Sequence, residues 1–166
     1  GAFIFNSTLD TEHDYLIISN IENIIPSLCK LLTINNHLLN CTVGECLEKI
    51  SERYGGIIIG DKSLFIKTSF LLIQLLMSQQ LKNKPKIHIC MCIYNLCKQI
   101  NSSGLKDLGL FSPYLNDLLN ILDTLAYMPL SYDYNSNLSY CSFLVFSKLL
   151  NISTKNDENT LQNYIQ

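Results

Sequence analysis

The stretch His88–Ile100, HICMCIYNLCKQI, has the residue spacing of an amphipathic helix, and it decides the fold class. At 100° per residue its apolar side chains fall in one arc of roughly 160°, the width of a core-facing stripe. These residues are Ile89, Cys90, Cys92, Ile93, Leu96, Cys97 and Ile100. Cys90 and Cys97 are separated by about 10 Å along the helix axis, too far for a disulfide or a shared metal ion. We therefore expect these cysteines to pack as small apolar residues between helices, with no metal bound.

The other face of this helix carries His88, Met91, Asn95 and Gln99, so one apolar side chain lies outside the core arc. Single exposed apolar residues are common and need no function. The preceding helical segment repeats the arrangement. Its core arc is Leu39, Val43, Cys46, Leu47 and Ile50, and opposite this arc stand Cys41, Glu45, Glu48 and Glu52. The carboxylate stripe is either an ordinary solvated face or, if these helices line a concave surface, a place that meets basic partners.

Helical periodicity extends over the rest of the chain, and the turn residues lie between the periodic segments. We expect three helix pairs, at about 16–55, 61–101 and 112–152. Residues 1–10 would end a preceding repeat and residues 156–166 would begin another. The run GGIIIGD is too short to form a strand without partners, so the predicted class is all-α.

Boundaries within the first pair follow from its turn residues. The residues DTEHDY are expected to form a polar loop, followed by a helix at about 17–33 in which Pro26 is a kink or a start point. A second helix at about 38–54 is expected to close at Gly55 and Gly56.

Three similar segments recur along the chain. PSLCKLL, SFLLIQLL and YLNDLLNIL are spaced by roughly 43 to 45 residues, and each is followed by a second amphipathic helix. This period is typical of HEAT or armadillo arrays. The sequence therefore predicts a single right-handed superhelical solenoid of stacked antiparallel helix pairs.

Composition narrows the function. The formal net charge is −2 and no basic run is present, so we expect no nucleic-acid or membrane partner. The most apolar run, LFIKTSFLLIQLLM, contains a lysine and is shorter than the ~20 residues that cross a bilayer. Seven cysteines, an odd number spread through helical segments, favour reduced thiols and an intracellular protein. Five Asn-x-Ser/Thr triplets are attributed to chance in a chain rich in asparagine.

No residues converge in a catalytic pattern. The sequence has no nucleophile and base at usable spacing, no phosphate-binding loop and no His/Cys cluster with ligand spacing. The glycines of GGIIIG lack the lysine and the strand-turn-helix context of a phosphate site. We expect a protein that binds other proteins, with no enzymatic activity and no cofactor.

Four segments resemble, in order and with matching spacing, the importin-β (karyopherin-β) nuclear transport receptors. The segment from GAFIFNSTLD to LCKLL is similar to that family's helix end, loop and following helix. LLNCTVGECLEKI is similar to VVRDTAAWTLGRI, HICMCIYNL to NVCWAFSSL, and NSNLSYCSFLVFSKLLNIS to QNNLRSSAYESLMEIVKNS. The likeness covers nearly the whole chain and implies a piece from the middle of a HEAT-repeat receptor.

The resemblance also implies partners. Family residues at the positions of Glu45, His88 and Met91, often tryptophan, asparagine and tryptophan, help to hold the basic segment of an importin-α-type adaptor on the concave wall. This chain has no tryptophan, and it has Asn40 and Ser139 where the family has arginines. The implied function is nuclear import, with adaptor or basic cargo on the concave face, phenylalanine-glycine nucleoporins, and the small GTPase Ran bound through other repeats. The implied location is the cytoplasm, the nucleus and the nuclear pore.

A HEAT-repeat scaffold, such as a regulatory subunit of a phosphatase, has the same helical period and is the alternative function. Binding of phenylalanine-glycine nucleoporins separates the two, because a transport receptor offers apolar slots between adjacent first helices on its convex face.

Overall fold

The computed structural model describes residues 11–102, 111, 114–127 and 137–152, and these form six α-helices and no strand. The prediction of an all-α protein is confirmed for this part of the chain. The helices are α1 (Thr11–Leu31), α2 (His37–Gly60), α3 (Lys62–Met77), α4 (Asn83–Ser102), α5 (Leu115–Ala126) and α6 (Leu138–Ile152). The segments 1–10 and 156–166, expected to belong to flanking repeats, lie outside the described residues.

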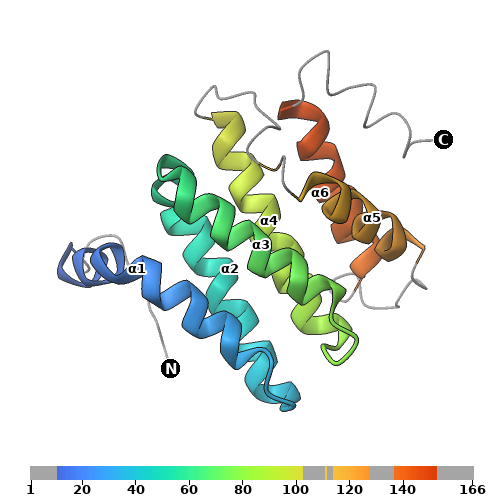
Figure 1. The fold of residues 1–166 in the computed structure, drawn as a ribbon, viewed down its shortest axis with the longest axis horizontal. Helices are drawn as coiled ribbons and strands as arrows, with labels where there is room; N and C mark the ends of the chain where they lie inside the picture. Colours follow the sequence, from blue (N-terminus) through green and yellow to red (C-terminus); the bar gives the residue numbers. More distant parts are fainter. Residues whose placement is uncertain (1–10, 103–110, 112–113, 128–136, 153–166) are drawn as a thin grey trace.

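The helices form two layers (Figure 1). Helices α1, α3 and α5 lie side by side on the near side of the molecule, and α2, α4 and α6 lie behind them. Each near helix also packs against the helix that follows it, so the chain makes three successive helix pairs within the described residues. Contacts in the far layer, between α2 and α4 and between α4 and α6, are the most extensive in the molecule. The far layer therefore provides most of the packing between pairs.

Short polar caps define where α2 and α3 begin. Asn36 precedes α2 and its side chain accepts a hydrogen bond from the amide of Leu39 at 3.1 Å. Asp61 lies between α2 and α3, and its carboxylate accepts from the amide of Leu64 at 3.2 Å. Each cap satisfies an amide that the first turn of a helix leaves unpaired. Asp61, with its extended backbone, is the single residue between the antiparallel helices α2 and α3.

Two predicted boundaries were wrong. The second helix does not close at Gly55 and Gly56 but continues to Gly60. Gly55 is buried against Gln99 of α4, where a Cβ atom would lie 2.9 Å from the Cγ of that side chain. This glycine therefore permits a close approach between helices, and it does not end a helix.

The second error concerns the start of α1. This helix begins at Thr11, so most of the expected polar loop DTEHDY is helical, and Pro26 lies inside the helix. Two acidic residues in the first turn favour a helix start at this point. One of them, Asp14, also bonds to side chains of α2, a contact between distant segments that local sequence patterns do not reveal.

The buried residues confirm the apolar arc that was predicted for the helix His88–Ile100. All seven residues of that arc are buried, Ile89, Cys90, Cys97 and Ile100 completely. The buried ring of Phe65 on α3 meets the ring of Phe111 edge to face, with centroids 5.1 Å apart. All seven cysteines are free thiols.

None of the helices in the described part of the chain combines the length and the hydropathy that a membrane crossing requires.

Candidate partner-binding surface

The row His88, Asn95 and Gln99 on α4 lies against α2. The side-chain amide of Asn95 donates to the hydroxyl of Ser51 at 3.1 Å and to the backbone carbonyl of Glu48 at 3.3 Å. The thiol of Cys92, one turn earlier, donates to the backbone carbonyl of Leu47 at 3.5 Å. These polar residues therefore help to join the two helices, and they are half-buried or buried.

Small residues on α2 make this approach possible. Gly44 faces His88, where a Cβ atom would lie 3.1 Å from the Cβ of the histidine, and Gly55 faces Gln99 in the same way. The residue numbers of the contacting pairs increase in the same direction along both helices, so α2 and α4 run parallel to each other. Asn95 and Ser51 are 44 residues apart in the sequence. This separation agrees with the spacing of the similar segments in the sequence, so equivalent positions of two helix pairs contact each other.

The three carboxylates of α2 have different surroundings. Glu45 pairs with Lys49 one turn later at 3.3 Å, and both side chains are about half exposed. A carboxylate oxygen of Glu48 lies 3.6 Å from Nδ1 of His88, longer than a hydrogen bond, and both side chains are mostly buried. Glu52 is exposed, and within the described residues it forms no ion pair. The stripe therefore carries less net negative charge than three unpaired carboxylates would.

The expected site residues share one surface. At 100° per residue, Glu45 and Glu52 are rotated to one side of the α2 row that contacts α4. Met91 is rotated to the corresponding side of α4, and it is partly buried against the core. We define the α2/α4 strip as this surface, made of Glu45, Glu48, Glu52, His88, Met91, Asn95 and Gln99. Its rim is acidic and its floor is polar and apolar, an arrangement that suits the aliphatic stem and charged end of a basic side chain.

Metal-ligating side chains do not cluster in the described residues. No group of three or more His, Cys, Asp or Glu side chains that could hold a metal ion occurs there. Burial raises the pKa of the Cys92 thiol, which bonds to the backbone carbonyl of Leu47, to about 12, so this thiol is protonated at neutral pH. What the strip offers is a surface for noncovalent contact.

Two further surface features were missed by the sequence reading. An open slot of about 650 Å³ lies between α3 and α5 in the near layer. We call it the α3/α5 slot, and it is lined by Lys62, Ser63, Ile66, Lys67, Phe70 and Tyr114. An apolar groove of about 610 Å³ lies between α5 and α6, where Phe143 is 60% exposed. Phe70 is not among the buried residues of α3. A large aromatic residue outside the core face of this helix was the sequence signal that could have indicated the slot.

The described residues thus define an all-α protein made of two layers of paired helices, with a mixed acidic and apolar strip on the far layer. Comparison with protein-family models, with curated protein sequences and with solved structures finds no match to this chain.

Proposed function

We propose that this chain is part of a HEAT-like, right-handed superhelical solenoid that binds protein partners along the α2/α4 strip. The observation that carries the proposal is the contact of residues 44 apart in the sequence, through which α2 and α4 pack in register. Helix pairs that repeat the same contact at the same spacing can add further pairs at either end. The exposed apolar groove between α5 and α6 is a surface on which another pair would stack.

The particular function that we propose is nuclear import, in which the parent protein carries adaptor or basic cargo through the nuclear pore under the control of Ran. The acidic rim, Glu45 and Glu52, and the apolar Met91 support the binding of a basic segment whose stems lie over the methionine. The proposal places the protein in the cytoplasm, the nucleus and the nuclear pore. It assigns no catalytic residue, no metal and no cofactor.

A HEAT-repeat scaffold for protein complexes is the second candidate function, and one observation favours it. His88 and Asn95 are engaged in packing α4 on α2, so they are less open to a ligand than an adaptor-binding ladder requires. The chain also has no tryptophan to place on such a ladder. A scaffold needs only the shape of the array and its exposed rims.

The test measures binding of the complete protein that contains this chain to a basic adaptor segment, with and without Ran loaded with GTP. An import receptor binds the segment and releases it when Ran-GTP is added. Binding that Ran-GTP does not change, together with no affinity for phenylalanine-glycine repeats, would favour the scaffold. No binding of a basic segment under any condition contradicts the assignment of the α2/α4 strip.

A further inference from the structure

The first two turns of α2 bring a histidine and a cysteine together at the surface. His37 is the first residue of the helix, and Cys41 follows one turn later on the same side. The sulfur of Cys41 lies 3.6 Å from Nε2 of His37 and 3.9 Å from Nδ1. His37 is exposed and Cys41 is partly exposed. Solvent and a partner can therefore reach both side chains.

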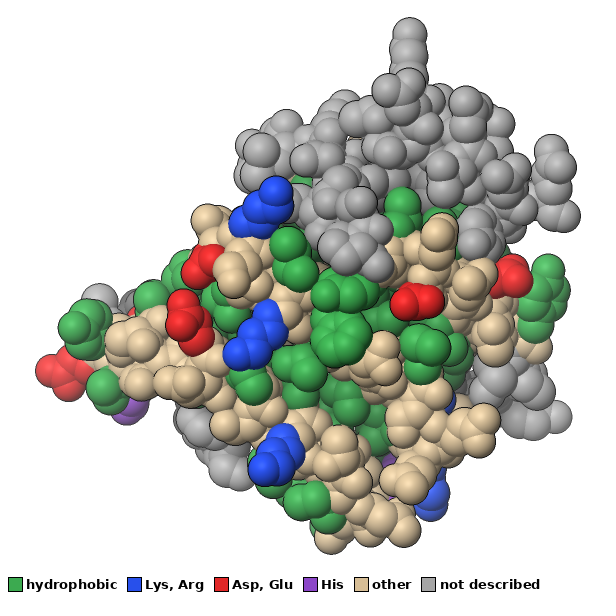
Figure 2. All heavy atoms as spheres, in the orientation of Figure 1, with side chains coloured by type: hydrophobic (Ala, Val, Ile, Leu, Met, Phe, Trp, Pro, Cys, Tyr) green, Lys and Arg blue, Asp and Glu red, His purple; other side chains and the backbone are tan. Residues whose placement is uncertain are grey.

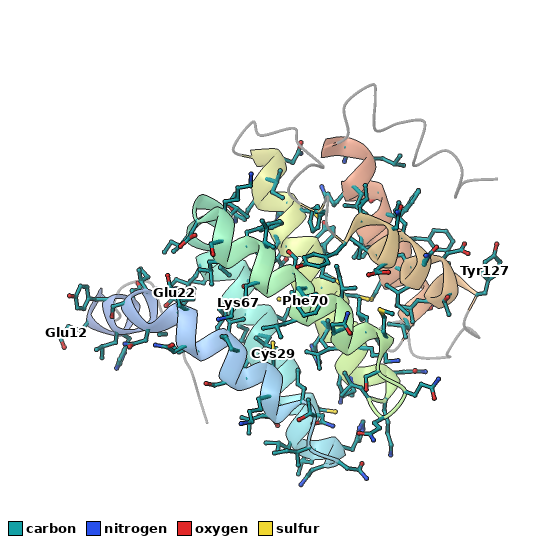
Figure 3. All side chains as sticks on the ribbon, in the orientation of Figure 1. Glu12, Glu22, Cys29, Lys67, Phe70 and Tyr127 are labelled. Carbon is teal, nitrogen blue, oxygen red and sulfur yellow. The ribbon has the colours of Figure 1, made fainter. Side chains whose placement is uncertain are left out.

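Cys41 differs in this respect from the cysteines that fill the core. Cys29 of α1 points into the molecule (Figure 3), where it is buried. Four further cysteines, on α4 and α6, are buried as well. Cys46 is partly exposed, but it packs against the core. Cys41 is thus the cysteine best placed to bind an external ligand.

The separation of the two side chains fits a tetrahedral zinc ion. Zinc binds a cysteine sulfur at about 2.3 Å and a histidine nitrogen at about 2.0–2.1 Å. At a tetrahedral angle, these two bonds hold the sulfur and the nitrogen about 3.5 Å apart. The observed distance from Sγ of Cys41 to Nε2 of His37 is 3.6 Å, so the pair can bind one zinc ion with little movement.

The pair supplies only half of the ligands that a closed zinc site needs. Structural zinc sites hold the metal with four protein ligands. Within the described residues, no third His, Cys, Asp or Glu side chain completes the pair. Glu45, one turn after Cys41, is paired with Lys49. For a closed site, the other two ligands must come from another chain.

Exposed apolar side chains lie close to the pair in the sequence. The turn that joins α1 to α2 forms the lower corner of the molecule in Figure 1, and Figure 2 shows hydrophobic side chains at the surface near the end of α1. Leu38, next to His37, is 79% exposed, and Ile34 in the turn is 49% exposed. A second copy placed against this corner would remove both from water.

We propose that two copies of this chain share one zinc ion at this corner, each contributing His37 and Cys41. A two-fold axis through the metal gives a tetrahedron of two cysteines and two histidines, a common ligand set of structural zinc. Each thiol releases its proton to solvent as it binds, so two thiolates balance the charge of Zn²⁺. The inference goes beyond the proposed function, because it uses no residue of the α2/α4 strip.

Sedimentation of the reduced full chain, with and without added Zn²⁺, tests this inference. We expect a monomer without zinc and a dimer that is complete at one zinc ion per two chains. A chelator should return the dimer to monomer, and acid should weaken the dimer because cysteine binds zinc as the thiolate. Co²⁺ in place of zinc should give the visible and near-ultraviolet absorption of a tetrahedral ion bound to thiolates.

Matched variants locate the metal. Cys41→Ser and His37→Gln should each abolish the zinc-dependent dimer, because each removes two of the four ligands from the assembled site. The controls are Cys46→Ser, at the other partly exposed cysteine of α2, and His13→Gln, at an exposed histidine of α1. Both controls should dimerise like the wild type. Thermal unfolding of each variant confirms that it is folded.

Three results would overturn the inference. The first is a chain that binds no Zn²⁺. The second is a monomer that binds one zinc ion per chain, in which water completes the site and no second copy takes part. The third is a zinc-dependent dimer that persists in Cys41→Ser or His37→Gln, which places the metal elsewhere. The binding of a basic segment and its response to Ran-GTP are measured separately, so either proposal can fail while the other stands.

Discussion

Arg53 on α2 holds the carboxylate of Asp14 on α1 through two hydrogen bonds, from Nε to Oδ1 at 2.9 Å and from Nη2 to Oδ2 at 3.0 Å. The hydroxyl of Tyr54 donates to the same carboxylate. The two partners are 39 residues apart, so the contact joins the first turn of α1 to a distant part of the chain on α2. Bidentate pairing of this kind is geometrically specific as well as attractive.

This pair predicts a dependence of stability on pH. The hydrogen bonds from Arg53 and Tyr54 lower the pKa of Asp14 below its ordinary value of 3.8. A carboxyl whose pKa is lower in the folded state stabilises the fold above its unfolded pKa, and this stability is lost as pH falls through the folded pKa. Asp14→Asn should lower the melting temperature at neutral pH and reduce the further loss below about pH 4.

Glu22→Gln is the matched control, because Glu22 is an exposed carboxylate on the same helix. It should change neither the melting temperature nor its acid dependence. Thermal melts of the wild type and both variants from neutral to acid pH check the prediction. Equal acid sensitivity of Asp14→Asn and the wild type would show that the pair contributes nothing to the pH dependence.

Substitution by alanine at two different glycines of α2 should have opposite effects on the stability of the fold. Gly44→Ala places a Cβ 3.1 Å from the Cβ of His88, an atom fixed to the α4 backbone, so overpacking should cost about 1–3 kcal/mol. Gly56→Ala meets only a side-chain oxygen of Gln99 at 3.9 Å and should gain about 0.5–1 kcal/mol from helix propensity. Urea unfolding measures both. Two variants that shift stability in the same direction would contradict the close approach of the helices.

These glycines also show what the sequence can and cannot predict. The core arc of α4, from Ile89 to Ile100, was predictable because helix periodicity is local. The end of α2 was not, because Gly55 looks like a cap in the sequence and acts as a packing residue only when α4 lies against it. The spacing of similar segments did anticipate which helices become neighbours.

Some features of the candidate site were likewise predictable from the sequence and others were not. The faces that carry Glu45, Glu52 and Met91 follow from counting residues along a helix. The pairing of Glu45 with Lys49 is local and was readable, whereas the hydrogen bonds of Asn95 to α2 depend on the rotation of one helix against another. The α3/α5 slot was missed because it needs Tyr114, which enters from a different helix pair.

The cysteines predict a graded reactivity. Burial raises the pKa of Cys97 to about 12 and that of Cys141 to about 11, so few thiolates exist at neutral pH. Cys41 is partly exposed, with its sulfur 3.6 Å from Nε2 of His37. Iodoacetamide followed by peptide mass mapping should label Cys41 first and the cysteines of α4 only after unfolding. Seven thiols should be titratable in the unfolded chain, and fast labelling of Cys97 in the native protein would contradict the buried arc.

Two phenylalanines on α3 provide a matched pair. Phe65 is fully buried against Phe111, so Phe65→Ala should cost about 3–5 kcal/mol through lost contacts and a cavity. Phe70 is 40% exposed, and Phe70→Ala should cost about 1 kcal/mol or less. Chemical denaturation of both variants measures the difference. Comparable losses would mean that Phe70 is a core residue and that the α3/α5 slot is filled from within the chain.

The last prediction concerns the α2/α4 strip. Reversal of Glu45, Glu48 and Glu52 together to lysine should weaken binding of a basic partner and flatten its dependence on salt, because the attraction that salt screens is removed. Glu48 lies beside the mostly buried His88, so a lysine there also disturbs the packing of the two helices. The cleaner variant reverses only Glu45 and Glu52, which are exposed. Exposed ion pairs contribute about 0.2–1 kcal/mol each, so the double reversal should weaken binding by roughly 1–2 kcal/mol.

Glu12→Lys combined with Glu22→Lys is the control for this reversal, since it makes the same charge change at exposed positions of α1. The control should lower the affinity only slightly, through the net charge, and it should keep the salt dependence of the wild type. Affinity is measured with a basic adaptor segment at low and high salt on the complete protein. If the Glu45 and Glu52 reversal behaves like the control, the acidic rim is a solvated face, and basic partners of this protein must bind to other helices.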